Sequence, residues 1–418
     1  MKSIQSFLLG ILMLMMCALE ANSEPIDDYG YSEIIIAVNQ PNVGGYFVDK
    51  QGKCLSKKYQ AVRVFSRGLA PVRQNGKWGF VNTKDELVIP CEYDDAGSFS
   101  KGLACVKKNG KWGFINIFGR LVIPCMYDNT WGFSEGLASV KQNGKYGFIN
   151  TKGEVVIPCI YDDAGSFSEG LAEVEKNGKR GLVNTQGKTV TPCVYDVIES
   201  FSEGFAVVMK NGKGGLINTY GQLVLPCKYD GVGGFSEGCV NVGLREGYCY
   251  ICSYIDAKGK VIKTFKDDLT GGFSDGLASI RRKGKWGFMN RRFQLVIPCV
   301  YDDSSHFSEG LAAVKQGRKW GFINTKGQMI VPCDYDLVRD FLGGIAVVKK
   351  NGKWGYISKN GRVKISCKYD RATPFKDGLA RVSKDGVWFI INQLGDVIVA
   401  ECHEYTEWSE DKIGSNIE

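Results

Sequence analysis

The chain has few of the residues from which common catalytic sites are built. It contains only two histidines in 418 residues, His306 and His403, and the sequence nominates no triad partner for either. Phosphate-cradling G-x-G-x-x-G and P-loop patterns and D-x-D-x-D-G calcium loops are missing. After the N-terminal run of residues 7–19, no apolar run approaches the ~20 residues that span a bilayer. The sequence therefore predicts no enzyme activity, no cofactor and no metal site.

The first residues are typical of a secretory signal peptide. A positive start at Met1-Lys2 precedes the apolar run of residues 7–19, and Ala21-Asn22-Ser23 supplies small residues for cleavage. We therefore interpret residues 1–23 as a signal peptide and expect an exported protein, whether periplasmic, cell-surface or secreted. The alternative is a lipoprotein signal that attaches the protein to a membrane through Cys17, which the large preceding Met16 disfavours.

The positive charge is distributed along the chain. The net charge is +8, and Lys and Arg recur at equivalent positions without forming a cluster in the sequence. A nucleic-acid-binding protein would carry a concentrated basic stripe. The pattern favours a solvated, lysine-rich surface and no nucleic-acid partner.

One unit of 34 residues fills almost all of the chain after the signal peptide. Tryptophan, or a replacement, recurs at this step, with four extra residues between 214 and 252. We call this position the ring slot. Its occupants are Trp78, Trp112, Tyr146, Arg180, Gly214, Cys252, Trp286, Trp320, Trp354 and Trp388. Repetition at such a period indicates a solenoid, a propeller or another array.

Each unit has the pattern of short β-strands. In GLACVKKNGKWGFIN, two runs rich in Val, Phe and Ile flank Asn109-Gly110, whose positive φ angles suit a type I′ hairpin turn. A third strand follows in LVI and ends at Pro124, and the next Tyr-Asp pair enters a loop. No segment has a helical period. The sequence predicts three strands per unit in an all-β fold.

A glycine follows the ring slot in almost every copy, even where the aromatic residue is lost, as at Gly181 and Gly215. The position therefore requires the absence of a side chain more than it requires the neighbouring ring. We predict a β-bulge there, or a neighbouring strand or ring packed directly on the backbone.

The phrases GKWGFIN, VIPCxYD and FSEGLA together resemble the bacterial WG-repeat family over roughly residues 31–400, in about ten units. The resemblance implies a β-rich repeat array, often exported or on the cell surface, with an interaction role and no accepted catalytic residues. The ring slot departs from the family pattern at 180, 214 and 252. The hairpin alone is also similar to shorter cell-wall-binding repeats that hold choline or glycans between aromatic rings.

The cysteines and the paired carboxylates can each be interpreted as structural residues or as parts of a chemical site. Seven of the 15 cysteines follow a proline at the repeat step, and Phe265 occupies the same slot in another unit, so the slot is typical of apolar packing. Disulfides between neighbouring units are the alternative. The lone Cys249-x-x-Cys252 has no second pair that would complete a zinc site. Pairs such as Asp94-Asp95 recur, which favours turn capping over catalysis.

The aromatic residues of the ring slot could form either a core or a binding ladder. As a core they would join one unit to the next. As exposed rings they could stack on sugars or capture a protein partner. The residues of this possible ladder are Trp78, Trp112, Tyr146, Trp286, Trp320 and Trp354.

We therefore predict an elongated, solenoid-like all-β array of about eleven units in residues 24–400. The unit around 241–268 is irregular, and residues 401–418 form a polar tail. Propeller-like closure is the alternative. The expected function is that of an exported, non-enzymatic scaffold for a protein partner at the bacterial envelope, and the alternative is a glycan- or cell-wall-binding array. A hydrolase site near Cys252 and Asp268 is a third hypothesis.

Overall fold

The computed structural model describes residues 35–40, 43–247 and 249–402, and these residues form β-strands, turns and loops. Residues 401 and 402 are described by their backbone only. The all-β tandem-repeat architecture is therefore confirmed. Within this part of the chain, no helix is long and apolar enough to cross a bilayer. The expected signal peptide at 1–23, the lipidation candidate Cys17, His403 and residues 403–418 of the tail lie outside the described residues.

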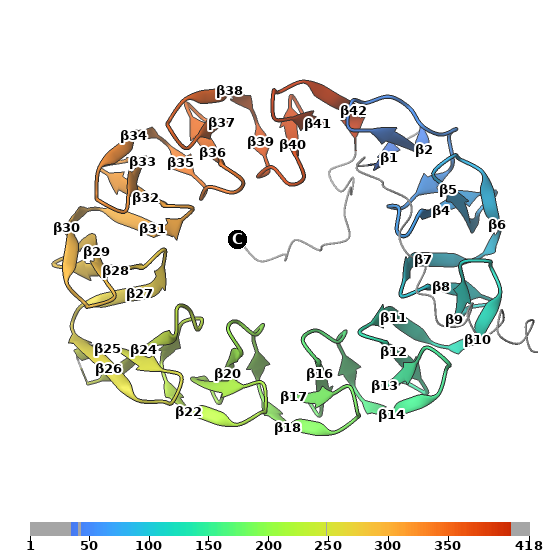
Figure 1. Ribbon diagram of the computed structural model, residues 1–418, viewed down its shortest axis with the longest axis horizontal. Coiled ribbons are helices and arrows are strands. Elements are labelled where there is room, and N and C mark those ends of the chain that lie inside the picture. The colour runs from blue at the N-terminus through green and yellow to red at the C-terminus, as the bar shows by residue number, and fades with distance from the viewer. Residues whose placement is uncertain (1–34, 41–42, 248, 403–418) are drawn as a thin grey trace, which may run out of the picture. The chain divides into compact units, whose positions relative to one another are not determined.

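Ten four-stranded antiparallel sheets follow a two-stranded sheet of β1 (Ile35–Gln40) and β2 (Gly44–Asp49), and successive sheets lie side by side (Figure 1). We call each four-stranded sheet a module. The first strands are β3 (Ala61–Val62), β7 (Asp95–Ser100), β11 (Asn129–Ser134), β15 (Asp163–Ala164), β19 (Val197–Ile198), β23 (Gly231–Val232), β27 (Leu269–Ser274), β31 (Asp303–Ser308), β35 (Leu337–Val338) and β39 (Arg371–Ala372). The second strands are β4 (Leu69–Gln74), β8 (Leu103–Lys108), β12 (Leu137–Gln142), β16 (Leu171–Lys176), β20 (Phe205–Lys210), β24 (Cys239–Glu246), β28 (Leu277–Arg282), β32 (Leu311–Gln316), β36 (Ile345–Lys350) and β40 (Leu379–Lys384).

The third strands are β5 (Lys77–Asn82), β9 (Lys111–Asn116), β13 (Lys145–Asn150), β17 (Lys179–Asn184), β21 (Lys213–Asn218), β25 (Cys249–Asp256), β29 (Lys285–Asn290), β33 (Lys319–Asn324), β37 (Lys353–Ser358) and β41 (Val387–Asn392). The fourth strands are β6 (Leu87–Tyr93), β10 (Leu121–Tyr127), β14 (Val155–Tyr161), β18 (Thr189–Tyr195), β22 (Leu223–Tyr229), β26 (Val261–Lys266), β30 (Leu295–Tyr301), β34 (Met329–Tyr335), β38 (Val363–Tyr369) and β42 (Val397–Cys402).

Each module has one strand more than the three that the sequence predicts. The additional strand is the first, which forms in the segment that we expected to be a loop after Tyr-Asp. In the β7 module this segment buries Ala96 and Phe99 completely or nearly so. Its backbone must then find hydrogen-bond partners, and it finds them on β8, where Ala96 pairs with Val106 and Phe99 with Ala104.

The predicted hairpin turn between the second and third strands is confirmed. At Asn109 and Gly110 the φ angles are +54° and +78°, as the central residues of a type I′ turn require. The same positive φ angles recur at Asn143-Gly144 and Asn351-Gly352. The Asn-Gly pair therefore fixes the register of this hairpin in each module that carries it.

The glycine after the ring slot lies where the third strand meets a bulge in the fourth. In the β33–β34 pair the register shifts between Trp320 and Phe322. A Cβ built on the intervening Gly321 would lie 2.3 Å from the carbonyl oxygen of Val331, which is backbone and has little freedom to move. The predicted bulge and close backbone approach are both confirmed, and they explain why glycine persists where the ring is lost.

The hydrophobic core lies between modules as well as within them. Phe80 and Tyr93 of one module pack with Phe99 and Val106 of the next, and Cys125 packs against the same cluster. The Phe80 and Phe99 ring centroids are 5.0 Å apart. Equivalent ring pairs cross the next boundaries, at Phe114–Phe133, Phe148–Phe167, Phe288–Phe307, Phe322–Phe341 and Tyr356–Phe375. Neighbouring modules therefore share a core, and we call each such boundary a seam.

Hydrogen bonds also cross the seams. The Ser100 hydroxyl donates to the carbonyl oxygen of Phe133 in the next module at 2.8 Å. The same bond recurs at other seams, as Ser66 to Phe99, Ser134 to Phe167, Ser236 to Phe273, Ser274 to Phe307 and Ser308 to Phe341. The glutamate that follows this serine accepts hydrogen bonds from the next module: Glu203 accepts from the backbone N–H groups of Glu237 and Gly238. The F-S-E-G phrase therefore repeats because each of its residues serves a seam.

The last module also contacts the beginning of the array, with a close backbone approach like that at an internal seam. A Cβ on Gly52 would lie 2.6 Å from the carbonyl oxygen of Ile398, and at an internal seam Gly221 stands in the same relation to Val190, at 2.3 Å. The Gln40 side-chain amide also donates to a backbone carbonyl of β42 at 2.7 Å. The propeller-like alternative predicts such contacts between the last module and the beginning of the array.

The Gly321→Ala substitution should destabilise the protein by roughly 1–3 kcal/mol, because its methyl group would overlap the Val331 carbonyl at the bulge. Thermal unfolding followed by circular dichroism measures the effect. The control is Gly234→Ala, where a Cβ would meet nothing within 4 Å. Equal unfolding temperatures for the two variants would contradict the close backbone approach.

Candidate binding surface

The turns between the second and third strands form a row in which consecutive modules are linked by an aspartate. Asp162, at the start of the β15 module, pairs with Lys145 of the preceding turn and accepts a hydrogen bond from the backbone N–H of Asn177 in the following turn. We call this row of turns the turn row and the linking residues the junction aspartates. They are Asp94, Asp128, Asp162, Asp196, Asp230, Asp302, Asp336 and Asp370.

Hydrogen bonding holds the junction aspartates in their charged form. The pKa of Asp302 is lowered by the hydrogen bond from Lys285 and by a backbone N–H donated from Gly317. Its sequence neighbour Asp303 instead accepts from the backbone N–H of Ser304. The two carboxylates of each Asp-Asp pair therefore have different backbone or side-chain partners, as the turn-capping interpretation predicts.

The ring slots lie beside this row, at the beginning of the third strands. Trp78 and Tyr146 are buried, at 8% and 6% exposure. The other four residues of the predicted ladder are half-buried: Trp112, Trp286, Trp320 and Trp354. Figure 1 places β29, β33 and β37, which carry the last three, in successive modules, and β9 in a separate part of the array. These rings contribute to the core and still reach the surface with part of their area.

A cation lies over each ring of the predicted ladder. Over Trp320 it is Lys315, whose Nζ is 5.6 Å from the ring centroid, within the range of cation–π attraction. Lys315 stands directly opposite Trp320 across the hairpin. The equivalent cross-strand pairs are Lys107–Trp112, Lys141–Tyr146, Arg281–Trp286 and Lys349–Trp354, and Arg63 covers Trp78.

In the three modules that lose the ring, the cation opposite it is lost as well. Glu175 faces Arg180 across the β16–β17 hairpin, Met209 faces Gly214, and Gly243 faces Cys252. The last module differs, because Trp388 keeps its ring but faces Ser383, and Arg371 lies over it instead.

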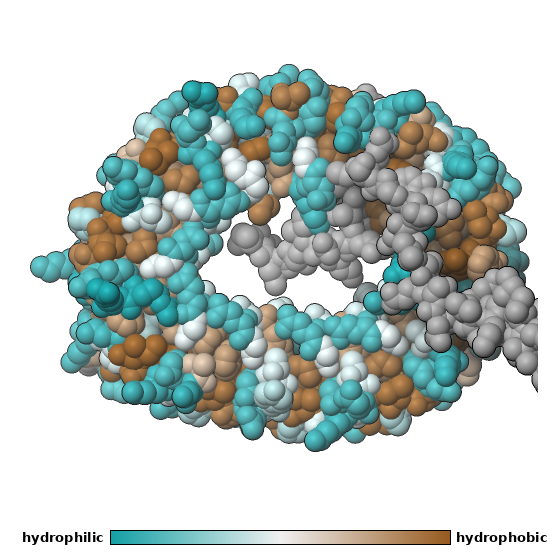
Figure 2. All heavy atoms as spheres, in the orientation of Figure 1, coloured by the Kyte–Doolittle hydropathy of each residue, from teal (hydrophilic) through white to brown (hydrophobic). Residues whose placement is uncertain are grey.

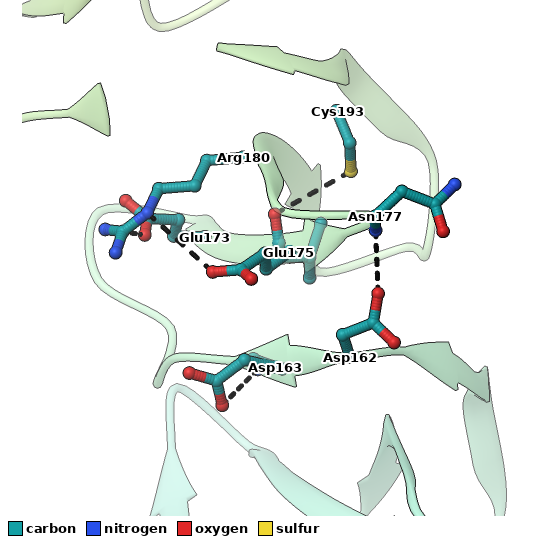
Figure 3. Close-up of polar contacts among 9 residues, drawn as sticks. Asp162, Asp163, Glu173, Glu175, Asn177, Arg180 and Cys193 are labelled. Carbon is teal, nitrogen blue, oxygen red and sulfur yellow. Dashed lines mark hydrogen bonds and ion pairs between the residues drawn. The ribbon is translucent and has the colours of Figure 1, made fainter. Parts of the chain in front are cut away.

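Figure 3 shows the first of these modules, where charge replaces the ring. The Arg180 guanidinium reaches both Glu173, at 2.7 Å, and Glu175, at 4.0 Å. Burial raises the pKa of the Glu173 carboxyl, and Arg180 opposes that shift. An ion-paired cluster thus occupies the position of the cation–π pair.

The cysteines whose side chains the structure describes, from Cys54 to Cys367, are free thiols. Figure 3 shows Cys193, whose thiol donates to a backbone carbonyl oxygen 3.7 Å away, that of Val174. Burial raises the pKa of the Cys193 thiol. The interpretation of this slot as a packing site is confirmed, and no disulfide joins the cysteines from Cys54 to Cys367. Cys252 of the lone C-x-x-C motif is buried opposite Phe265, while Asp268 pairs with Arg282.

The modules define the class of this chain as an all-β tandem-repeat protein. The model of the WG containing repeat family matches ten consecutive stretches, at residues 47–78, 78–112, 112–146, 146–179, 181–213, 215–247, 253–286, 286–320, 320–354 and 354–388. The chain therefore belongs to the WG containing repeat family, as its motifs predict. No curated protein matches it in sequence.

Solved structures resemble the chain weakly. PorZ, a bacterial surface component of the type-IX secretion system of Porphyromonas gingivalis, is 9% identical with a TM-score of 0.27, over 91% of this chain and 70% of that chain. The Pan2 WD40 domain of Neurospora crassa is 12% identical with a TM-score of 0.29, over 56% of this chain and 90% of that chain. Alignments at these scores assign no function to this chain.

The turn row is a surface that the sequence alone did not reveal. Cations placed 34 residues apart appear scattered along the chain, yet the junction aspartates bring their turns next to one another. The signal that could have found the unit is a Lys or Arg five residues before the ring, as in Lys315 and Trp320. That spacing places two residues opposite each other across a hairpin with a two-residue turn.

The Asp302→Asn substitution should lower the unfolding temperature at neutral pH by about 1–3 °C, because it removes the ion pair with Lys285. The folded-state pKa lies below the ordinary 3.8, so the stabilisation is present above that value and is lost as the pH falls through the folded-state pKa. Wild type and variant should therefore converge in thermal melts once the pH falls below the folded-state pKa of Asp302. Asp377→Asn, at an exposed turn, is the control, and a difference that persists in acid would contradict the account.

Proposed function

We propose that this protein is an exported, non-enzymatic scaffold that binds a protein partner at the bacterial envelope. The observation that carries the proposal is a row of exposed apolar side chains at the beginning of the fourth strands, which we call the apolar row. Its members are Leu87, Val88, Leu121, Val122, Val155, Leu223, Val261, Ile262, Leu295, Val296, Met329, Val363 and Val397. Exposed apolar side chains that gather on one surface are typical of protein interaction sites.

The side chains of the apolar row face solvent and do not contribute to the core. Leu295 and Val296 are 44% and 43% exposed, whereas the next residue, Ile297, is buried at 2%. The core therefore begins one residue later, and the first two positions face solvent. Figure 2 shows brown hydrophobic patches that recur among teal ones over successive modules. A partner could contact several modules at once, which multiplies weak contacts into stable binding.

The fourth strands also limit how a partner can bind. Each is the last strand of its sheet, and most contain a proline, such as Pro298 in β30. Proline removes a backbone donor and is typical of edge strands that are protected from further pairing. The side chains of the apolar row, more than added strand pairing, would then form the interface.

The Leu295→Lys/Val363→Lys double variant should lose capture of an envelope partner by at least about tenfold, because a buried lysine is costly at an apolar interface. The partner is identified by cross-linking wild-type protein in envelope extracts and is then purified for direct binding. The control is Phe118→Lys/Leu394→Lys, which changes equally apolar residues at turns, 82% and 80% exposed, outside the row. Equal binding of the partner to both double variants would contradict the proposal.

A further inference from the structure

The ring–cation units fall into two tracts along the chain. Three consecutive modules carry Arg281 with Trp286, Lys315 with Trp320, and Lys349 with Trp354. A shorter tract lies in the early modules, at Lys107 with Trp112 and Lys141 with Tyr146. The modules between the tracts carry Glu175, Met209 and Gly243 at the cation position. The modules between the tracts therefore lack the unit, while the first and last modules carry a variant of it, with Arg63 over Trp78 and Arg371 over Trp388.

The cations of these three units form no close ion pair with a carboxylate. The neighbouring Lys319 pairs with the junction aspartate Asp336, but no ion pair within the described ranges joins Arg281, Lys315 or Lys349 to an acidic side chain. Each lies over a ring. The charge of Lys315 also lowers the pKa of Asp302, but no ion pair joins the two side chains, so the cation can still bind a second anion. Because consecutive turns are linked by junction aspartates, the three charges lie along one row.

We propose that this tract, Arg281/Trp286, Lys315/Trp320 and Lys349/Trp354, binds an anionic polysaccharide. The acidic group of a sugar would pair with the cation, and its C–H groups would pack along the exposed part of the half-buried indole. A polymer with a repeating charged sugar can engage several modules in turn.

The arrangement favours this class over a nucleic acid. Bases stack on open aromatic faces. Here a cation lies over each ring, as Arg281 lies 6.0 Å from the centroid of Trp286. A sugar needs only the charge and the ring edge beside it. The inference specifies the chemical class of the ligand for the glycan-binding alternative. It does not depend on the apolar row. The test of the ring–cation tract and the test of the apolar row can therefore fail independently.

The test is a titration of the chain lacking residues 1–23 with polygalacturonate, followed by tryptophan fluorescence and calorimetry at several salt concentrations. Neutral dextran, polyglutamate and single-stranded DNA are the comparison polymers. Wild type should bind polygalacturonate most tightly, with affinity that falls as salt rises, and should not bind dextran. The Arg281→Gln/Lys315→Gln/Lys349→Gln variant should bind at least about tenfold more weakly.

The matched control is Lys152→Gln/Lys258→Gln/Lys326→Gln, which removes the same charge from exposed turns between third and fourth strands. It should stay within about twofold of wild type. Lys315→Arg should keep binding that Lys315→Gln loses, which separates lost charge from lost structure. Equal loss in the control triple variant, equal binding of dextran, tighter binding of DNA or polyglutamate, or no binding by wild type would each overturn the inference.

Discussion

The structure depends on contacts by which each module covers the apolar face of the next. At one seam the Phe322 and Phe341 ring centroids are 4.8 Å apart, and the Ser308 hydroxyl donates across the same boundary to the Phe341 carbonyl. One 34-residue module exposes too much of its core to be stable alone. Packed rings and satisfied backbone groups at every seam make the array one folded body.

This constraint accounts for most of the residues that recur in the sequence. The glycine after the ring slot admits a bulge, the serine and glutamate of F-S-E-G bond to the next module, and the cysteine fills part of the shared core. Repeated residues would ordinarily suggest repeated chemistry, but here they serve assembly. The positions left for recognition are those the seams do not use, namely the apolar row and the cations beside the ring slots.

Much of the fold could be predicted from sequence because the determining signals are local. Asn109-Gly110 specifies its hairpin through backbone conformation, and Phe265 in a cysteine slot identifies that slot as apolar. The additional strand could not be predicted in this way. The segment around Ala96 becomes a strand because β8 offers it backbone partners, and no periodic pattern in so short a segment reports this.

The candidate surface was predicted less well, for a related reason. The six ladder residues recur visibly in the sequence, but sequence spacing could not show that a cation covers each ring. Nor could it show that turns 34 residues apart are neighbours, since the link through Asp162 and Asn177 exists only in three dimensions.

Hydrogen exchange on a Phe341→Ala variant tests the central claim most directly. Phe341 packs on Phe322 of the preceding module, so loss of its ring should reduce protection in β33 and β36, on both sides of the seam. Reduced protection in both strands is the result that shared cores predict. Loss confined to the module that contains Phe341, with β33 as protected as in wild type, would show that modules are independently stable and would contradict the account.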